Sequence, residues 1–129
     1  MGPKISAAAA LVVLTIGAGS ASAHHSVAGR FDGSRRTEIT GTISRIDWIN
    51  PHTYVYLDVR DEQGNVTTWR LESLPTTMLE RVGLTSEMLM AGGATVTAGV
   101  LPARDASTRL AWLLKLTYAD GHFYQLAGE

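Results

Sequence analysis

The chain contains no cysteine among its 129 residues, and only 7% of them are aromatic. The lack of thiols excludes disulfides, a lipid attached at a leader cysteine, and any metal site that needs a thiolate ligand. An exported form of this chain therefore has to fold on its apolar core alone. Acidic and basic residues nearly cancel, at 12 and 11, which disfavours nucleic acid as a partner because its binders usually carry a basic face.

One apolar stretch near the start is typical of a secretory leader. It runs from about Ile5 to Ile16 behind Lys4, and an Ala-x-Ala triplet ending at Ala23 follows it. This order indicates a signal peptide, and the apolar run is too short to remain as a membrane anchor. We expect a periplasmic or secreted protein with three parts: a signal peptide (1–23), an extended Gly/Ser/Arg-rich arm (24–36) and one domain (37–129).

The domain reads as mainly β. Alternating apolar residues predict strands over 37–48, 53–59, 66–72, 94–101 and 109–118, with a short closing strand in the tail. In the first strand the apolar parity changes between Ile43 and Ile46, which predicts a bulge and a bend. In the fifth strand both faces are apolar, so we expect it to be central or covered.

The period changes to that of a helix after Pro75. Met78, Leu79 and Val82 have helical spacing, Gly83 is placed as a stop, and Thr85 or Ser86 can cap a further short turn before Met90. Three strands, a helix and two strands predict a small OB-like, five-stranded antiparallel barrel with the helix between strands three and four. An open antiparallel sheet with one helix on its face is the alternative.

The paired histidines behind the leader carry the most chemistry. Cleavage after Ala23 makes His24 the first residue, so that its amine and imidazole can chelate one metal ion, and His25 or a distant His completes the set. Such nitrogen ligands favour Cu(II) among the divalent ions of the first transition row. Cleavage two residues earlier puts a histidine third, which also suits Cu(II) or Ni(II). The competing interpretation is a solvated linker.

His52 is the best third ligand, because Pro51 stiffens the loop that carries it after Trp48 and Asn50. Alone, it reads as an ordinary loop histidine, and His122 in the tail is a weaker candidate. Asp32, Asp47 and Asp58 offer carboxylates that can orient a ligating imidazole.

A second candidate surface is the outward side of the second strand, where Tyr54, Tyr56 and Asp58 alternate with core residues. Tyrosines on such a face can stack on a ligand or simply pack across strands. Trp48, Trp69 and Trp112 fit core or rim positions. No catalytic motif is present. Ser26 and His25 are neighbours in the sequence, which does not place them as a nucleophile and its base, so we expect no enzymatic activity.

The quoted segments resemble the family known as domain of unknown function 6152. They are "AHHSVAGRFD", "ITGTISRIDWINPHTYVYLDV" and the tryptophan of "TTWRLE", and the resemblance covers nearly all of the chain behind the leader. The carried-over motif residues are His24, His25, Ser26, Asn50, Pro51 and His52, and Val27 stands where the family usually has Phe. The resemblance implies a periplasmic single-domain protein without an assigned activity. Three hypotheses follow: a copper-binding module, a metal-free ligand- or protein-binding module, and an accessory subunit of an exported redox enzyme.

Overall fold

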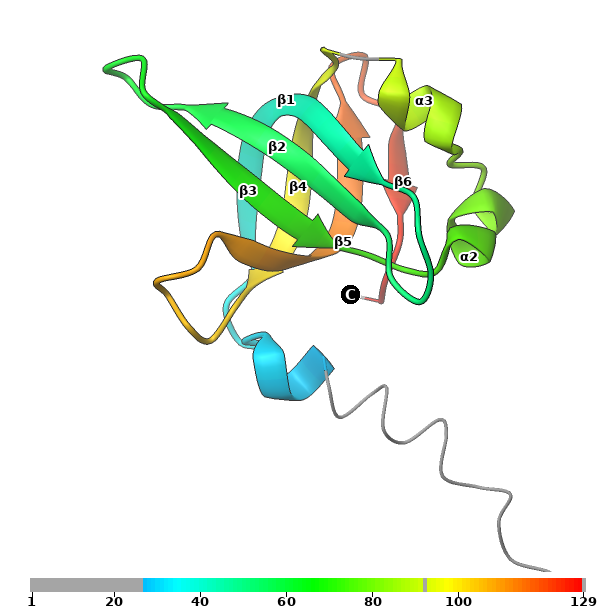
Figure 1. The fold of residues 1–129 in the computed structure, drawn as a ribbon, viewed down its shortest axis with the longest axis horizontal. Helices are drawn as coiled ribbons and strands as arrows, with labels where there is room; N and C mark the ends of the chain where they lie inside the picture. Colours follow the sequence, from blue (N-terminus) through cyan, green and yellow to red (C-terminus); the bar gives the residue numbers. More distant parts are fainter. Residues whose placement is uncertain (1–26, 92, 129) are drawn as a thin grey trace, which may run out of the picture.

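The computed structural model describes residues 27–91 and 93–128, and five of its strands close a barrel (Figure 1). They are β1 (Thr37–Asp47), β2 (Tyr54–Arg60), β3 (Val66–Glu72), β4 (Thr95–Pro102) and β5 (Leu110–Tyr118). The hydrogen-bonded order is β3-β2-β1-β4-β5, and β3 also pairs with β5. A sixth strand, β6 (Phe123–Gln125), extends the sheet along β5 beyond its contact with β3. The predicted OB-like barrel is confirmed.

One pair of strands differs from the antiparallel barrel that the sequence predicted. Residues 70–72 of β3 run parallel to residues 110–112 of β5, while every other neighbouring pair in the ring is antiparallel. The reason is geometric: five strands in a closed ring cannot alternate in direction all the way round. One parallel pair is therefore required, and the barrel is mixed.

β1 is long and bent, so it belongs to both halves of the barrel. Its first part pairs with β4 and its second part with β2, and the register shifts between Ile43 and Arg45, which confirms the predicted bulge. Just before the bulge, a Cβ on Gly41 would lie 2.7 Å from the backbone oxygen of Asp58. Glycine is therefore required where β1 turns closely over β2.

The inward faces of all five strands build the main core. Val55 and Leu57 of β2 are buried, and Val59, Trp69 and Tyr118 pack against the core from half-buried positions. Each fully buried aliphatic side chain stabilises the fold by roughly 1.5–3 kcal/mol. The fully buried members from the later strands are Leu71, Val96, Ala98, Val100, Ala111, Leu113 and Leu116.

Two short helices replace the helical segment expected between β3 and β4. They are α2 (Thr76–Arg81) and α3 (Ser86–Met90), and they lie beside one end of the barrel (Figure 1). Gly83 separates them with a φ of +85°, and the Thr85 side chain caps α3, as predicted. Of the three apolar residues with helical spacing only Leu79 is buried; Met78 and Val82 are exposed.

The arm is not extended over its described part, which corrects the prediction. Residues 27–30 form a helical turn, and Phe31 then forms an antiparallel bridge with Ala103. Phe31 is buried in a second apolar group, the outer cluster (Phe31, Ala103, Trp112 and Leu114). This cluster covers the outward face of β5 and explains why that strand is apolar on both sides. Across the described residues, no helix has the length and apolar character needed to cross a membrane.

Candidate functional site

The three predicted metal ligands fall on two parts of the chain. His24 and His25, together with Ser26, lie outside the described residues. His52 lies in the β1–β2 loop (residues 48–53), in which the Asn50–Pro51 peptide bond is cis. This loop is tied to the start of α2, because Asn50 Oδ1 accepts hydrogen bonds from the backbone N and the hydroxyl of Thr76 at 3.1 and 3.2 Å.

The His52 imidazole is oriented through its Nδ1 atom. Nδ1 lies 3.2 Å from the backbone oxygen of Ser73 and 3.2 Å from Oε1 of Glu72. A carbonyl oxygen can only accept a hydrogen bond, so Nδ1 is the protonated nitrogen in this contact, and Nε2 is the ring nitrogen that the contact does not use. The His52 side chain is 25% exposed.

Glu72 connects this histidine to the arm. Its side chain is only 4% exposed, and Oε2 lies 3.0 Å from Nη1 of Arg30 in the helical turn. Arg30 also donates to Oε1 at 3.4 Å. A buried carboxylate needs partners of this kind, because an unpaired charge in the interior is strongly destabilising. One carboxylate therefore contacts both the His52 loop and the arm.

The outer cluster brings the arm to the same place. The centroid of the Trp112 ring lies 5.7 Å from that of the His52 ring, in an edge-to-face arrangement, and 5.9 Å from that of the Phe31 ring. Val27, the first described residue, packs against this cluster. Two backbone hydrogen bonds, each 2.9 Å long, hold the arm in position. They run from Asp32 N to Pro102 O and from Arg104 N to Arg30 O.

Two buried hydroxyls lie next to the residues of the contact between His52 and Glu72: Thr53 follows His52 in the sequence, and Ser73 follows Glu72 at the end of β3. Thr53 and Ser73 are fully buried and paired by the backbone bond from Ser73 N to Thr53 O at 2.8 Å. Neither Thr53 Oγ1 nor Ser73 Oγ has a hydrogen-bond partner among the described residues. Buried polar atoms without partners are uncommon in folded proteins and mark places where a water or an ion is often held.

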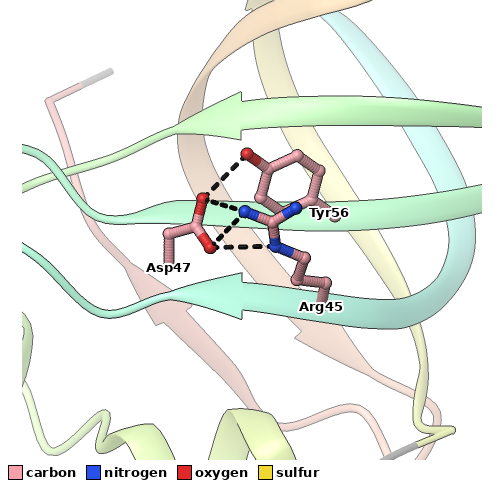
Figure 2. Close-up of polar contacts among 3 residues, drawn as sticks. All are labelled: Arg45, Asp47 and Tyr56. Carbon is pink, nitrogen blue, oxygen red and sulfur yellow. Dashed lines mark hydrogen bonds and ion pairs between the residues drawn. The ribbon is translucent and has the colours of Figure 1, made fainter.

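The predicted ligand face on β2 forms a polar network of its own. Figure 2 shows Arg45 and Tyr56 converging on Asp47: Arg45 Nε and Nη2 donate to the carboxylate at 2.7–2.9 Å, and the Tyr56 hydroxyl donates to Oδ2 at 2.9 Å. The Arg45 guanidinium also lies over the Tyr56 ring, 4.6 Å from its centroid. One face of the ring is thus covered by the protein itself.

The neighbouring residues of this face are paired in the same way. The guanidinium of Arg70 lies 5.2 Å from the centroid of the Tyr54 ring, and Thr68 Oγ1 donates to Asp58 at 2.7 Å. Both partners come from β3: Thr68 lies directly opposite Asp58, whereas Arg70 lies opposite Tyr56 and reaches Tyr54 diagonally. The face is therefore a set of cross-strand pairs, which leaves less free aromatic surface than the sequence alone implied.

The network also shifts two pKa values. Hydrogen bonds from Arg45, and then from Tyr56, lower the pKa of the Asp47 carboxyl below its usual value. Burial, followed by the hydrogen bond to Asp47, raises the pKa of the Tyr56 hydroxyl. Both shifts favour the arrangement in which Asp47 is ionised and Tyr56 keeps its proton.

The tryptophans take the positions expected of them: Trp48 and Trp69 pack half-buried against the main core, and Trp112 is buried in the outer cluster. Sequence reasoning missed Glu72 and Arg30. Glu72 ends a strand on its outward side and is covered by the arm and the His52 loop together, which alternation could not reveal. The single large apolar residue of the arm, Phe31, was the signal that the arm docks.

Among residues 27–91 and 93–128 there is no group of three or more His, Asp or Glu side chains placed to hold a metal ion. His52 and Glu72 therefore do not form a metal site by themselves.

Comparisons with curated proteins and with solved structures find no match. A family model does match, over residues 11–111, and this span contains the paired histidines, the Asn-Pro-His loop and all strands up to the start of β5. The chain belongs to the family of unknown function DUF6152.

Proposed function

We propose that the protein is an exported, non-enzymatic module that binds a transition metal, copper(II), at the corner formed by the β1–β2 loop and the arm. His52 contributes Nε2, and His24 and His25 contribute the remaining nitrogen ligands. The observation that carries the proposal is the contact of His52 Nδ1 with the backbone oxygen of Ser73 and with Oε1 of Glu72. Metal-binding histidines almost always donate the second ring N–H to a carboxylate or a carbonyl, which fixes the tautomer and strengthens the free nitrogen as a ligand.

The docked arm supports a role for the terminal histidines. Val27 packs against the outer cluster, and Trp112 of that cluster contacts His52. Consecutive Cα atoms are about 3.8 Å apart, so the chain keeps His25 within about 8 Å of Val27 and His24 within about 12 Å. The proposal requires the two histidine side chains, on a tether of this length, to reach a common ion with the loop imidazole.

Copper fits the chemistry of the proposed ligands. Processing after Ala23 gives His24 a free amine, which forms a chelate with its own imidazole. Nitrogen ligands without thiolates bind Cu(II) most tightly among the divalent ions of the series.

The test begins with the protein isolated after export, whose first residue is identified by mass spectrometry. Cu(II) titration against a competing chelator then compares the wild type with His24→Ala, His52→Ala and His122→Ala. His122 is the matched control, because its ring stacks on Tyr118 at 4.6 Å in the tail and has no place in the proposed site. We expect His24→Ala to abolish tight uptake, His52→Ala to weaken it and His122→Ala to leave it unchanged.

Glu72→Gln tests the carrying observation itself. Loss of an outer-shell partner typically lowers metal affinity about 10- to 100-fold, so this variant should bind more weakly while keeping the same ligands. Arg30→Gln removes the other partner of Glu72 and distinguishes a loose arm from a misoriented imidazole. The proposal is refuted if His52→Ala binds copper as well as His122→Ala, or if processing removes His24.

A second candidate function is the binding of a small ligand or a partner protein, for example an exported redox enzyme, on the outward face of β1–β3. The observation that favours it is Arg45, which is 63% exposed on its side chain yet fixed by Asp47 and by the Tyr56 ring. A rigid exposed guanidinium beside aromatic rings suits an anionic or aromatic group. Tyr54→Ala and Tyr56→Ala would then abolish partner binding, whereas the histidine variants would not.

A further inference from the structure

A groove of about 220 Å³ crosses the outer surface of β1, β4, β5 and β6, and it shares only Leu114 with the outer cluster beside the proposed metal site. Its chemically distinctive lining residues are Arg36, Glu38, Gly99, Leu114, Lys115 and Gln125. Four of these belong to one row across the sheet, because Glu38 pairs with Gly99, Gly99 with Lys115, and Lys115 with Gln125. Directly paired residues point to the same face of a sheet. The row therefore presents a carboxylate, a gap, an ammonium group and an amide.

Neither the backbone conformation nor the space at Gly99 requires a glycine, so the missing side chain has no steric explanation. Gly99 is not among the glycines with positive φ, and a Cβ at this position would meet its nearest atom, Lys115 Cβ, at an ordinary 3.5 Å. Gly41 is the opposite case, since a Cβ there would collide with the neighbouring backbone. A glycine that the chain does not need sterically costs strand stability. At Gly99 its effect is to leave the floor between Glu38 and Lys115 bare.

The two charges on either side of the gap are not paired with each other. Glu38 and Lys115 are separated by two strand spacings, roughly 10 Å, and no ion pair within 4.0 Å joins them or involves Arg36 among the described residues. The Lys115 ammonium instead lies 4.2 Å from the centroid of the Phe123 ring. The groove thus presents separated charges of opposite sign.

A bulge in β5 shapes the same groove. Gly99 pairs with Lys115 and Val100 with Leu113, so Leu114 is an extra residue in β5 and lies beside Lys115 on the groove. The Leu114 carbonyl is held by the backbone N of Leu126 at 2.8 Å and by the side-chain amide of Gln125 at 3.3 Å. Bulges are frequent next to functional sites, where they redirect a side chain.

We propose that this groove binds a small zwitterion of the α-amino-acid class. Lys115 and Arg36 hold the carboxylate, Glu38 at the other side of Gly99 holds the ammonium group, and Leu114 contacts the apolar part. Charge-assisted hydrogen bonds of this kind are the stronger ones in proteins. A volume of about 220 Å³ leaves room for a small amino acid. The proposal does not depend on the metal site.

The test titrates the exported protein, labelled with ¹⁵N, with L-alanine, acetate or ethylamine. L-alanine should shift the amide signals of Gly99, Lys115 and Gln125 in a saturable way, and the two half-ligands should do so at least about tenfold more weakly, because each makes only one set of charged bonds. Lys115→Gln should weaken L-alanine binding about tenfold or more, and Arg81→Gln, a surface change on α2 outside the groove, should have no effect.

Gly99→Leu should abolish binding by filling the floor of the groove, and its amide spectrum will show whether it folds. If it does not fold, Lys115→Gln and Glu38→Gln decide the question. The proposal is overturned if L-alanine shifts none of these signals, if acetate alone binds as tightly, or if Lys115→Gln binds like the wild type.

Discussion

Replacing Phe31 by alanine should destabilise the whole barrel, although Phe31 precedes the first strand. Phe31 is 1% exposed and packs against Trp112 with ring centroids 5.9 Å apart. Phe→Ala changes in cores cost about 3–5 kcal/mol. The outer cluster is small and edged by half-buried side chains, which allows some collapse, so we expect the low end, about 3 kcal/mol. That is a large part of the roughly 5–15 kcal/mol that stabilises a domain.

Urea unfolding of the purified protein measures this cost. With a slope of roughly 1.5 kcal/mol per molar, typical of a small domain, the midpoint should fall by about 2 M with little change in slope. Phe123→Ala is the matched control, because Phe123 is 55% exposed, and it should cost less than about 1 kcal/mol. Equal costs for the two variants would refute the conclusion that the arm is an integral part of the core.

Three further outcomes follow from contacts in the barrel. Gly41→Ala should destabilise by about 3 kcal/mol in thermal or urea unfolding, because its Cβ would lie 2.7 Å from the rigid backbone oxygen of Asp58; a cost under about 1 kcal/mol would contradict this contact. Arg45→Gln should raise the pKa of Asp47 toward its usual value, as followed by carboxyl NMR. Since the folded pKa is lowered, the stability that Asp47 contributes is present above the normal carboxyl range and is lost as pH falls through the folded pKa, so the wild type and this variant should converge in acid. Thr85→Ala should cost about 1 kcal/mol through loss of the cap of α3, and an unchanged midpoint would argue against that cap.

Local patterns in the sequence were sufficient to predict the strands of the fold. Alternation placed the inward residues of β2 and β4 correctly, and the parity change between Ile43 and Ile46 located the bulge. The apolar run of β5 indicated that both its faces are covered. These features depend on a few neighbouring residues, and such signals are present in a single sequence.

Features that depend on distant segments were not predictable in the same way. The parallel contact of β3 with β5 follows from closing the ring, and no residue in either strand encodes it alone. Similarly, Glu72 looks like an exposed residue at the end of a strand until Arg30 of the arm and His52 of the loop are placed against it. His52 was found because of its proline neighbour, but its partner Glu72 lies 20 positions later and needed the β2–β3 pairing to be identified.

The pairing of β1 constrains the order in which the chain can fold while it is being synthesised. Thr37 pairs with Val100, and residues 110–112 complete the ring, so the earliest strand waits for partners that emerge more than sixty residues later. Closing such distant segments is slow and entropically costly. The barrel of a growing chain therefore cannot close until residues 110–112 have been synthesised.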